Sequence, residues 1–169
     1  MAIYHLSVKV ISRSTGASAL AAGAYRCAGR LYDERLNRHH DFTHKQDVIH
    51  SEVMVPEGAP ERWKDREALW SNVELSEKRK DAQLAREVEF AIPREVTQAQ
   101  GIELARDFVA QEFVSRGMVA DLNIHWDKGL DGEAKPHAHV MLTMREVEGQ
   151  DFGAKVRAWN ATSLVEHWR

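Results

Sequence analysis

The sequence predicts an α+β domain, in which helices pack on the apolar face of an antiparallel sheet and the other face is partly open. Two observations favour this class. Segments in which apolar and polar residues alternate are about as well represented as segments with helical periodicity. The last two alternating segments are joined by the short connector KGLDGEAK, which contains Asp131-Gly132. Strands joined by so short a loop must be antiparallel.

The alternating segments predict half-buried strands. Strands are expected over residues 3–11, 48–55, 85–92, 119–127 and 136–146. The residues of the first segment that are expected to face the core are Tyr4, Leu6, Val8 and Val10. Residues 30–47 are polar with little periodicity, and a loop or a loose hairpin fits them.

The helical segments fall between these strands. Helices are expected over residues 17–28, 61–77 and about 98–116, with a short final helix from near Asn160. The first is rich in alanine and ends near a glycine. The second carries Trp63, Trp70 and Val73 on one stripe. In the third, Thr97 can cap the start and Gly117 stops the end.

Length and composition indicate a single compact domain over residues 1–169. The lone cysteine, Cys27, excludes an intramolecular disulfide and favours a reducing cytoplasm. No apolar run approaches the roughly 20 residues of a membrane span. The chain ends at Arg169, just after an amphipathic segment begins, so we expect it to be a piece of a longer protein.

The net charge of −3 argues against a simple non-specific nucleic-acid binder, which usually carries a basic surface. A domain of this charge that holds DNA needs a local basic patch, a metal, or both. One candidate patch comprises Arg26, Arg30, Arg35, Arg38, His39, His40, His44 and Lys45. A second run, Lys78–Lys80, is better interpreted as a solvated face.

Three histidines are expected on one face of the sheet. His137 and His139 lie two residues apart on one predicted strand, opposite its apolar residues, and His125 has the same parity on the preceding strand. Neighbouring strands are about 4.8 Å apart, so the three imidazoles can reach one ion and leave other positions open to a substrate. The alternative is three ordinary surface histidines in a chain that has nine.

Carboxylates accompany these histidines. Asp127 shares the face of His125 and is either a ligand, an orienting group or a solvated turn residue. Glu87 and Glu89 have the parity that brings them to the same face. Each could accept the second ring N–H of a metal-bound histidine, serve as a general base, or lie on a solvated strand face. Three nitrogen ligands favour late transition ions, whereas a phosphate substrate favours Mg²⁺ or Mn²⁺.

The chain has three tyrosines, and Tyr25 lies in the alanine-rich helix beside Arg26. A tyrosine can attack phosphorus if its hydroxyl loses the proton and the phosphate charge is neutralised. The residue pattern alone favours Tyr25 as a packed helix residue.

The sequence resembles the MobA/MobL relaxases, which nick DNA in plasmid mobilisation and conjugation, and most closely the N-terminal domain of TraA-type conjugation proteins. Three stretches carry the resemblance and anchor essentially the whole chain. They are MAIYHLSVKVISRSTGASALAAGAYR, KRKDAQLAREVEFAIP and IHWDKGLDGEAKPHAHVMLTMR.

The resemblance implies the HUH-endonuclease fold, with an antiparallel sheet of about five strands flanked by helices. It implies a metal-dependent transesterification, with Mg²⁺ or Mn²⁺, on single-stranded DNA at the nick site of an origin of transfer. It also implies a bacterial cytoplasmic setting, accessory origin-binding proteins and a coupling protein. The residues that match family positions are Tyr25 as nucleophile, His125, His137 and His139 as metal ligands, and Glu89 as an orienting group or base. Arg13, Arg26 and Lys9 are our candidates for phosphate contacts.

Three alternatives stay open. A rolling-circle replication initiator uses the same chemistry, but its tyrosine usually follows the His-x-His pair, whereas Tyr25 precedes it. A non-catalytic DNA-binding module could hold a structural zinc with the three histidines. A hydrolytic metallonuclease would use water as the nucleophile.

Overall fold

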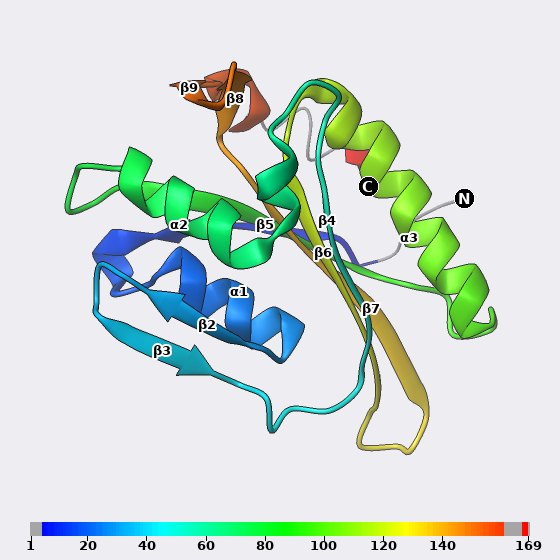
Figure 1. The fold of residues 1–169 in the computed structure, drawn as a ribbon. Helices are drawn as coiled ribbons and strands as arrows, with labels where there is room; N and C mark the ends of the chain where they lie inside the picture. The colour runs from blue at the N-terminus through cyan, green and yellow to red at the C-terminus, as the bar shows by residue number, and fades with distance from the viewer. Residues whose placement is uncertain (1–4, 161–166, 169) are drawn as a thin grey trace.

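The computed structural model describes residues 5–160 and 167–168. Its centre is a five-stranded sheet in which every neighbouring pair is antiparallel and the strand order is β1-β5-β7-β6-β4 (Figure 1). The strands are β1 (Ser7–Ser12), β4 (Val48–Met54), β5 (Gln83–Ala91), β6 (Ala120–Lys128) and β7 (Ala134–Leu142). The predicted α+β class with an antiparallel sheet is confirmed.

Helix α3 (Gln98–Glu112) covers one face of the sheet. Thr97 begins it with a capping box, in which its side chain accepts from the Gln100 backbone and the Gln100 side chain accepts from Thr97. A 3-10 turn follows, and Gly117 ends it at φ 102°, a value that favours glycine. The core beneath α3 includes Val88, Phe90, Ile124, Val140, Val109 and Phe113, all nearly inaccessible.

The other face is covered by α1 (Ala19–Cys27) and α2 (Arg66–Ser76), which follows a 3-10 turn at Glu61–Lys64. Figure 1 shows α1 and α2 on the side of the sheet away from α3. The expectation of a partly open face is therefore wrong over much of its length. The strands show why. Ala85 and Met141 alternate onto the same face as the polar residues of their strands, yet both are buried against these helices.

A two-stranded hairpin, β2 (Arg30–Asp33) with β3 (Arg38–Asp41), follows α1 and confirms the hairpin alternative for this segment. It is tied to the start of α1 through a buried carboxylate. Asp33 accepts from the hydroxyl of Ser18, the cap of α1, at 2.6 Å and lies 3.0 Å from Nε2 of His40. The hairpin therefore fixes α1 from its solvent side.

Other expectations need correction. The segment 136–146 is not one strand, because β7 ends at Leu142 and a second hairpin begins, β8 (Arg145–Glu148) with β9 (Asp151–Lys155). This hairpin packs Phe152 flat on Trp63, with ring centroids 4.1 Å apart. Val10 is 42% exposed at the edge of the sheet, so it does not face the core. Tyr4 lies outside the described residues. So do residues 161–166, which follow the 3-10 turn Arg157–Asn160 and to which most of the expected final helix belongs.

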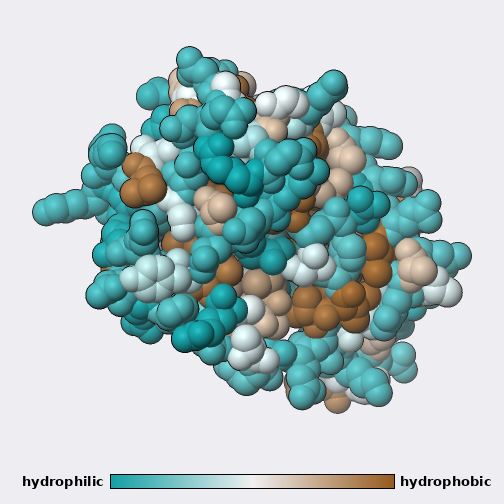
Figure 2. All heavy atoms as spheres, viewed as in Figure 1, coloured by the Kyte–Doolittle hydropathy of each residue, from teal (hydrophilic) through white to brown (hydrophobic). Residues whose placement is uncertain are grey.

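Within the described residues, no helix is long and apolar enough to cross a membrane. The surface in Figure 2 is mostly hydrophilic, with small apolar patches between polar side chains.

Candidate metal centre and nucleophile

The register of β6 against β7 brings the three histidines together. His125 pairs directly with His137, and Asn123 pairs with His139, which places all three rings at one end of the same face. Their ring centroids are 4.7 to 5.2 Å apart, and each offers a nitrogen within 4.8 Å of the others. The predicted sharing of one face is confirmed, and the donor set fits a single transition-type or divalent cation.

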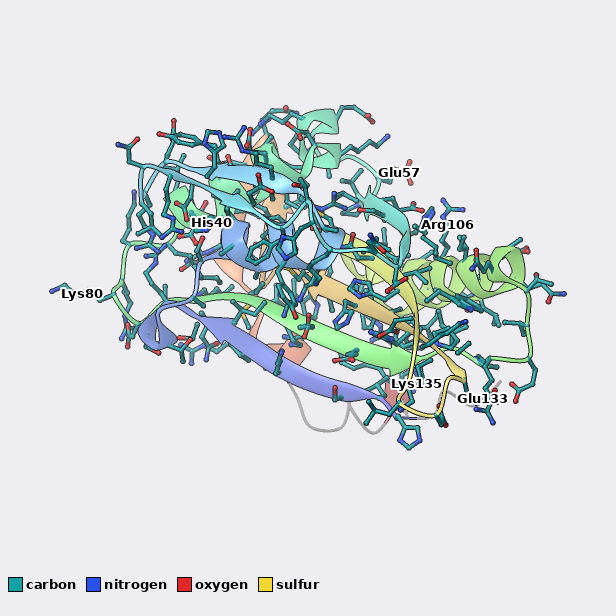
Figure 3. The ribbon with its side chains drawn as sticks, turned by 90° about the horizontal axis from the view of Figure 1, so that it is seen from below. His40, Glu57, Lys80, Arg106, Glu133 and Lys135 are labelled. Atoms are coloured by element: carbon teal, nitrogen blue, oxygen red, sulfur yellow. The ribbon has the colours of Figure 1, made fainter. Side chains whose placement is uncertain are left out.

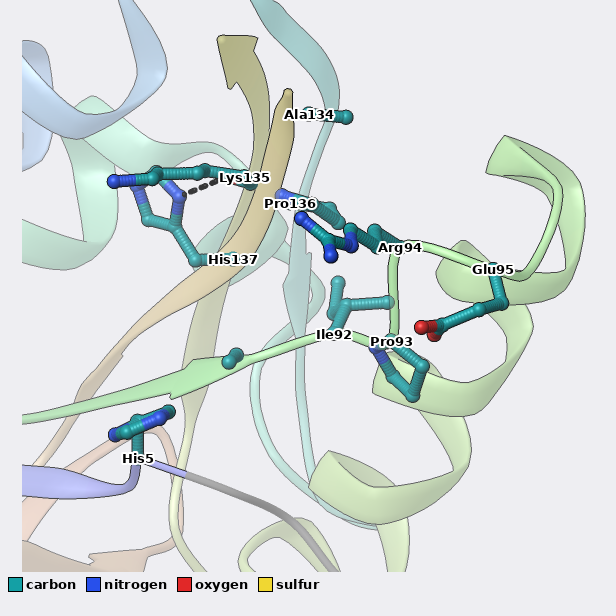
Figure 4. Close-up of a pocket in the computed structure, with 10 residues that line it drawn as sticks. His5, Ile92, Pro93, Arg94, Glu95, Ala134, Lys135, Pro136 and His137 are labelled. Atoms are coloured by element: carbon teal, nitrogen blue, oxygen red, sulfur yellow. Dashed lines mark hydrogen bonds between the residues drawn. The ribbon is translucent and has the colours of Figure 1, made fainter. Parts of the chain in front are cut away.

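Two of the rings are oriented by backbone carbonyls. Nε2 of His125 donates to the carbonyl of Arg26 at 2.8 Å, and Nδ1 of His137 donates to the carbonyl of Lys135 at 2.9 Å (Figure 4). A carbonyl only accepts, so each bond places the proton and leaves the other ring nitrogen with a lone pair. Metal-binding histidines are commonly held in this way.

Burial keeps His125 neutral. Desolvation lowers the pKa of its imidazole to about 4, against the opposing effect of the bond to the Arg26 carbonyl, with His139 and His137 lowering it further. A neutral ring at physiological pH is the form that binds a metal ion.

Glu87 orients the third ring. Its carboxylate is 1% exposed, lies 3.4 Å from Nδ1 of His139, and pairs with the guanidinium of Arg26 and, at 3.2 Å, with Lys9. Burial alone would raise the pKa of Glu87, but the contact with His139 and the hydrogen bond and charge of Arg26 hold it well below its ordinary value. A fixed carboxylate anion of this kind suits orientation better than proton transfer.

Glu89 has a different environment. It pairs in register with His139, its side chain is 40% exposed, and its Oε1 lies 3.9 Å from Nε2 of that ring. This carboxylate faces the side of the imidazole that a metal and its substrate would occupy. Of the two glutamates, Glu89 is the one with access to a bound substrate.

Asp127 lies at the edge of the cluster. Its Oδ1 is 3.5 Å from Nδ1 of His137, and its side chain is 46% exposed. That nitrogen already donates to the Lys135 carbonyl, so Asp127 makes an electrostatic contact with His137 and accepts no hydrogen bond from its ring.

Tyr25 lies in the last turn of α1, which Ser18 caps at its start. Tyr25 is 49% exposed, which does not fit a packed helix residue. The same turn is attached to the histidine cluster, since the carbonyl that orients His125 belongs to Arg26, the next residue. Sequence positions a hundred residues apart are thereby joined at one site.

The three candidates for phosphate contacts are placed differently. Lys9 is 62% exposed, and its ion pair with Glu87 holds it beside the site. Arg26 is buried, committed to Glu87, and supports the site from behind. Arg13 is not brought to the cluster, because it lies beyond the far end of β1 and binds Glu74 at 2.5 Å.

A cavity of about 700 Å³ adjoins His137 (Figure 4). Its lining combines the basic side chains of His5, Arg94 and Lys135 with the acidic Glu95 and with apolar groups from the segment that follows β5 and from the start of β7. Figure 3 places Lys135, at the start of β7, near Glu133 of the β6–β7 connection. The sequence interpretation missed Lys135, although its parity with His137 and His139 is a usable signal.

The comparison with known proteins decides the family. The profile of the MobA/MobL family matches residues 17–167, almost the entire chain. The chain belongs to the MobA/MobL family.

Relatives of this MobA/MobL chain include the conjugal transfer protein TraA of Agrobacterium fabrum, 40% identical over 166 residues that cover 92% of the chain. Mobilization protein MobL of Acidithiobacillus ferridurans is 42% identical over 81% of the chain. The chain spans 14% of the length of that TraA and 36% of that MobL.

A solved structure described as "Molecular Basis of Vancomycin Resistance Transfer in Staphylococcus aureus" is similar in fold and in sequence to this MobA/MobL chain. It aligns with a TM-score of 0.89 and 35% identity over 99% of the chain and 87% of its own length. The similarity therefore extends over the full sheet and its flanking helices.

Proposed function

We propose that the chain is a relaxase domain of the HUH type, which nicks one DNA strand at an origin of transfer through a 5′-phosphotyrosine intermediate on Tyr25. The observation that carries this proposal is the attachment of the α1 turn bearing Tyr25 to the three-histidine cluster, through the bond from His125 to the Arg26 carbonyl. An exposed tyrosine beside an open-sided set of imidazoles suits transfer of a phosphoryl group.

His125, His137 and His139 would hold the metal, for which we propose Mg²⁺ or Mn²⁺ in cells. Three nitrogen donors also suit later transition ions, which we expect to bind in vitro. When bound, the cation would polarise the scissile phosphate and offset the charge that builds on its oxygens.

Side chains of the protein carry out the nucleophilic attack and the proton transfer. The Tyr25 oxygen forms a bond to phosphorus while the bond from phosphorus to the 3′-oxygen breaks. The phenol proton passes to a base, for which Glu89 is the candidate, and the 3′-oxygen leaves as a hydroxyl after taking up a proton. The phosphotyrosine conserves the phosphodiester, so a free 3′-hydroxyl can reverse the step and rejoin the strand. Glu87 and Asp127 keep the imidazoles oriented.

The substrate we propose is single-stranded DNA at a nick site, for conjugation or mobilisation of a plasmid. The names of the bacterial relatives, "Conjugal transfer protein" and "Mobilization protein", support this role. Lys9 and Lys135 are exposed beside the cluster and are our candidates for backbone phosphates. The setting we propose is the bacterial cytoplasm, with accessory origin-binding proteins and a coupling protein as partners.

A covalent-adduct assay tests the proposal. Labelled single-stranded DNA with the cognate nick site is incubated with the protein and Mg²⁺ or Mn²⁺ and resolved on a denaturing protein gel. We expect a labelled protein band that is lost in Tyr25→Phe and retained in the control Tyr32→Phe. Nicked DNA without a labelled band would indicate a hydrolytic metallonuclease, and no nicking would leave a non-catalytic DNA-binding module.

The metal assignment has its own measurement. His137→Ala should weaken Mn²⁺ binding in calorimetry and adduct formation together, because it removes one of three ligands. The variant should keep its unfolding transition. Unchanged Mn²⁺ binding would contradict the assignment.

A further inference from the structure

Lys45 lies against the candidate nucleophile. The sequence pattern places it only in a candidate basic patch, and the proposed chemistry gives it no role. Its Nζ is 3.3 Å from the centroid of the Tyr25 ring and also donates to the Tyr25 carbonyl at 2.8 Å. The ammonium therefore contacts the face of the ring and the backbone of the same residue. Such a double contact fixes both the ring and the helix turn that carries it.

The segment that carries Lys45 is a structured connection between β3 and β4. The backbone N–H of Lys45 donates to the carbonyl of Phe42 at 3.0 Å, and the N–H of Phe42 donates to the carbonyl of Gly29 at 2.9 Å. Asp41 accepts from both the N–H and the hydroxyl of Thr43. The connection is thereby folded back onto the end of α1.

The same connection also reaches the histidine cluster. The ring of Phe42 packs edge-on against Tyr25, with centroids 5.3 Å apart. Two residues after Lys45, the carbonyl of Asp47 accepts from the N–H of Trp126 at 2.8 Å, beside His125. Lys45 is thus held between the tyrosine and the strand that supplies one of the imidazoles.

The ammonium is not neutralised by a described acid. Lys45 is half-buried, and no ion pair with a carboxylate engages it within residues 5–160 and 167–168. Desolvation lowers the pKa of its amine, and the charge of Arg26 lowers it further. Arg26 itself is committed to Glu87. The Arg26 guanidinium lies 6.0 Å from the centroid of the Tyr25 ring, so Lys45 is the nearer of these two cations and the one whose charge is available to the ring.

We propose that Lys45 is a positioning residue for the transesterification, which holds the Tyr25 ring and stabilises the negative charge that develops on it during attack. A cation above the face of a neutral phenol ring is attracted to the negative charge of its π-electrons. The attraction strengthens as the phenol becomes a phenolate, because the oxygen shares its charge with the ring. The interaction is thus stronger in the transition state than in the ground state, which is the condition for raising the rate of the chemical step. This proposal rests on the function proposed for Tyr25.

The test separates the chemical step from DNA binding. Adduct formation is followed in single turnovers at saturating cognate DNA with Mn²⁺, for the wild type, Lys45→Met, Lys45→Arg and the exposed control Lys64→Met. We expect Lys45→Met to lower the rate constant about tenfold and Lys45→Arg, which keeps the charge, to recover most of it. Affinity for an uncleavable DNA should change less than about threefold, and Lys64→Met should match the wild type.

Two outcomes would overturn the proposal. One is a rate constant for Lys45→Met equal to that of the wild type. The other is a loss confined to DNA affinity, which would make Lys45 an ordinary phosphate contact. Thermal unfolding and Mn²⁺ titration of each variant verify that the fold and the metal site are intact.

An NMR measurement tests the contact without relying on activity. The ε-methylene protons of Lys45 should be shifted upfield by the Tyr25 ring in the wild type and in Tyr25→Phe, but not in Tyr25→Leu. An unshifted wild-type signal would contradict the contact. A wild type that shows the shift but forms no adduct would contradict the proposed function instead.

Discussion

At the scale of single residues, Glu87 and Glu89 lie two residues apart on β5, yet their surroundings differ. Glu87 is buried with Arg26, whereas Glu89 is 40% exposed at the rim of the histidine cluster. We expect Glu87→Gln to lower the free energy of unfolding by about 3 kcal/mol, because it leaves a buried guanidinium without its counter-charge. Denaturant unfolding measures this loss.

Glu89→Gln should behave in the opposite way. Its effect on the free energy of unfolding should stay within about 0.5 kcal/mol, as at other exposed positions. Its rate of adduct formation should fall about 100-fold if Glu89 is the base. Equal effects of the two substitutions on stability and on rate would contradict the division of roles.

The free energy of unfolding of the metal-free protein should depend on pH through His125. Its folded pKa is about 4 against an ordinary value of 6.5. Below pH 6.5 the unfolded chain takes up a proton at this ring, which the folded chain does not do until about pH 4. The free energy of unfolding should therefore fall by about 3 kcal/mol across that window from this group alone.

The matched control is His125→Asn, in the presence of a chelator. This variant should lose that part of the pH dependence and keep the part that the carboxylates contribute. Identical pH profiles of stability for wild type and variant would refute a buried neutral imidazole at this position.

The face on which a site residue lies could be predicted from the sequence where the alternation of side chains along a strand determines it. His125, His137 and His139 share a face because side chains alternate along a strand. Parity could not predict the exposure of Tyr25 or the contact with Lys45, because these depend on how the end of α1 packs against the connection after β3. The prediction that Tyr25 is the nucleophile rests on the resemblance to relaxases and not on periodicity.

At the scale of elements, the start of α3 was predicted correctly from the sequence, and its capping box explains why. Thr97→Ala removes a side-chain acceptor from the first turn, and we expect it to lower the free energy of unfolding by about 1 kcal/mol. Because α3 covers the face away from the histidines, the rate of adduct formation should not change. A slowed rate in the folded variant would mean that α3 contributes to the site.

The hairpins were harder to predict than the helices and long strands. β8 and β9 are short, and β8 follows β7 after two residues, so the apolar alternation continues across the break. The coverage of the second sheet face by α1 and α2 was missed for a related reason. Alternation assigns parity to Ala85 and Met141 but does not show which helix lies above them.

At the scale of the whole molecule, two apolar cores lie on opposite faces of the sheet, and the histidine cluster belongs to neither. We therefore expect the fold to persist after chelation, with a melting temperature that rises as Mn²⁺ is added. Thermal unfolding monitored by circular dichroism measures both. Unfolding on chelation would instead indicate a structural zinc site.

The central claim is that the three histidines hold a phosphate for attack by Tyr25. Mass spectrometry of the trapped product tests it most directly: wild-type protein is reacted with cognate single-stranded DNA and Mn²⁺, digested with protease and nuclease, and its peptides are sequenced. The account predicts a 5′-nucleotide on the α1 peptide, at Tyr25, which is absent when His137 is replaced by alanine. Nicked DNA with an unmodified Tyr25, or a nucleotide on Tyr32, would contradict it.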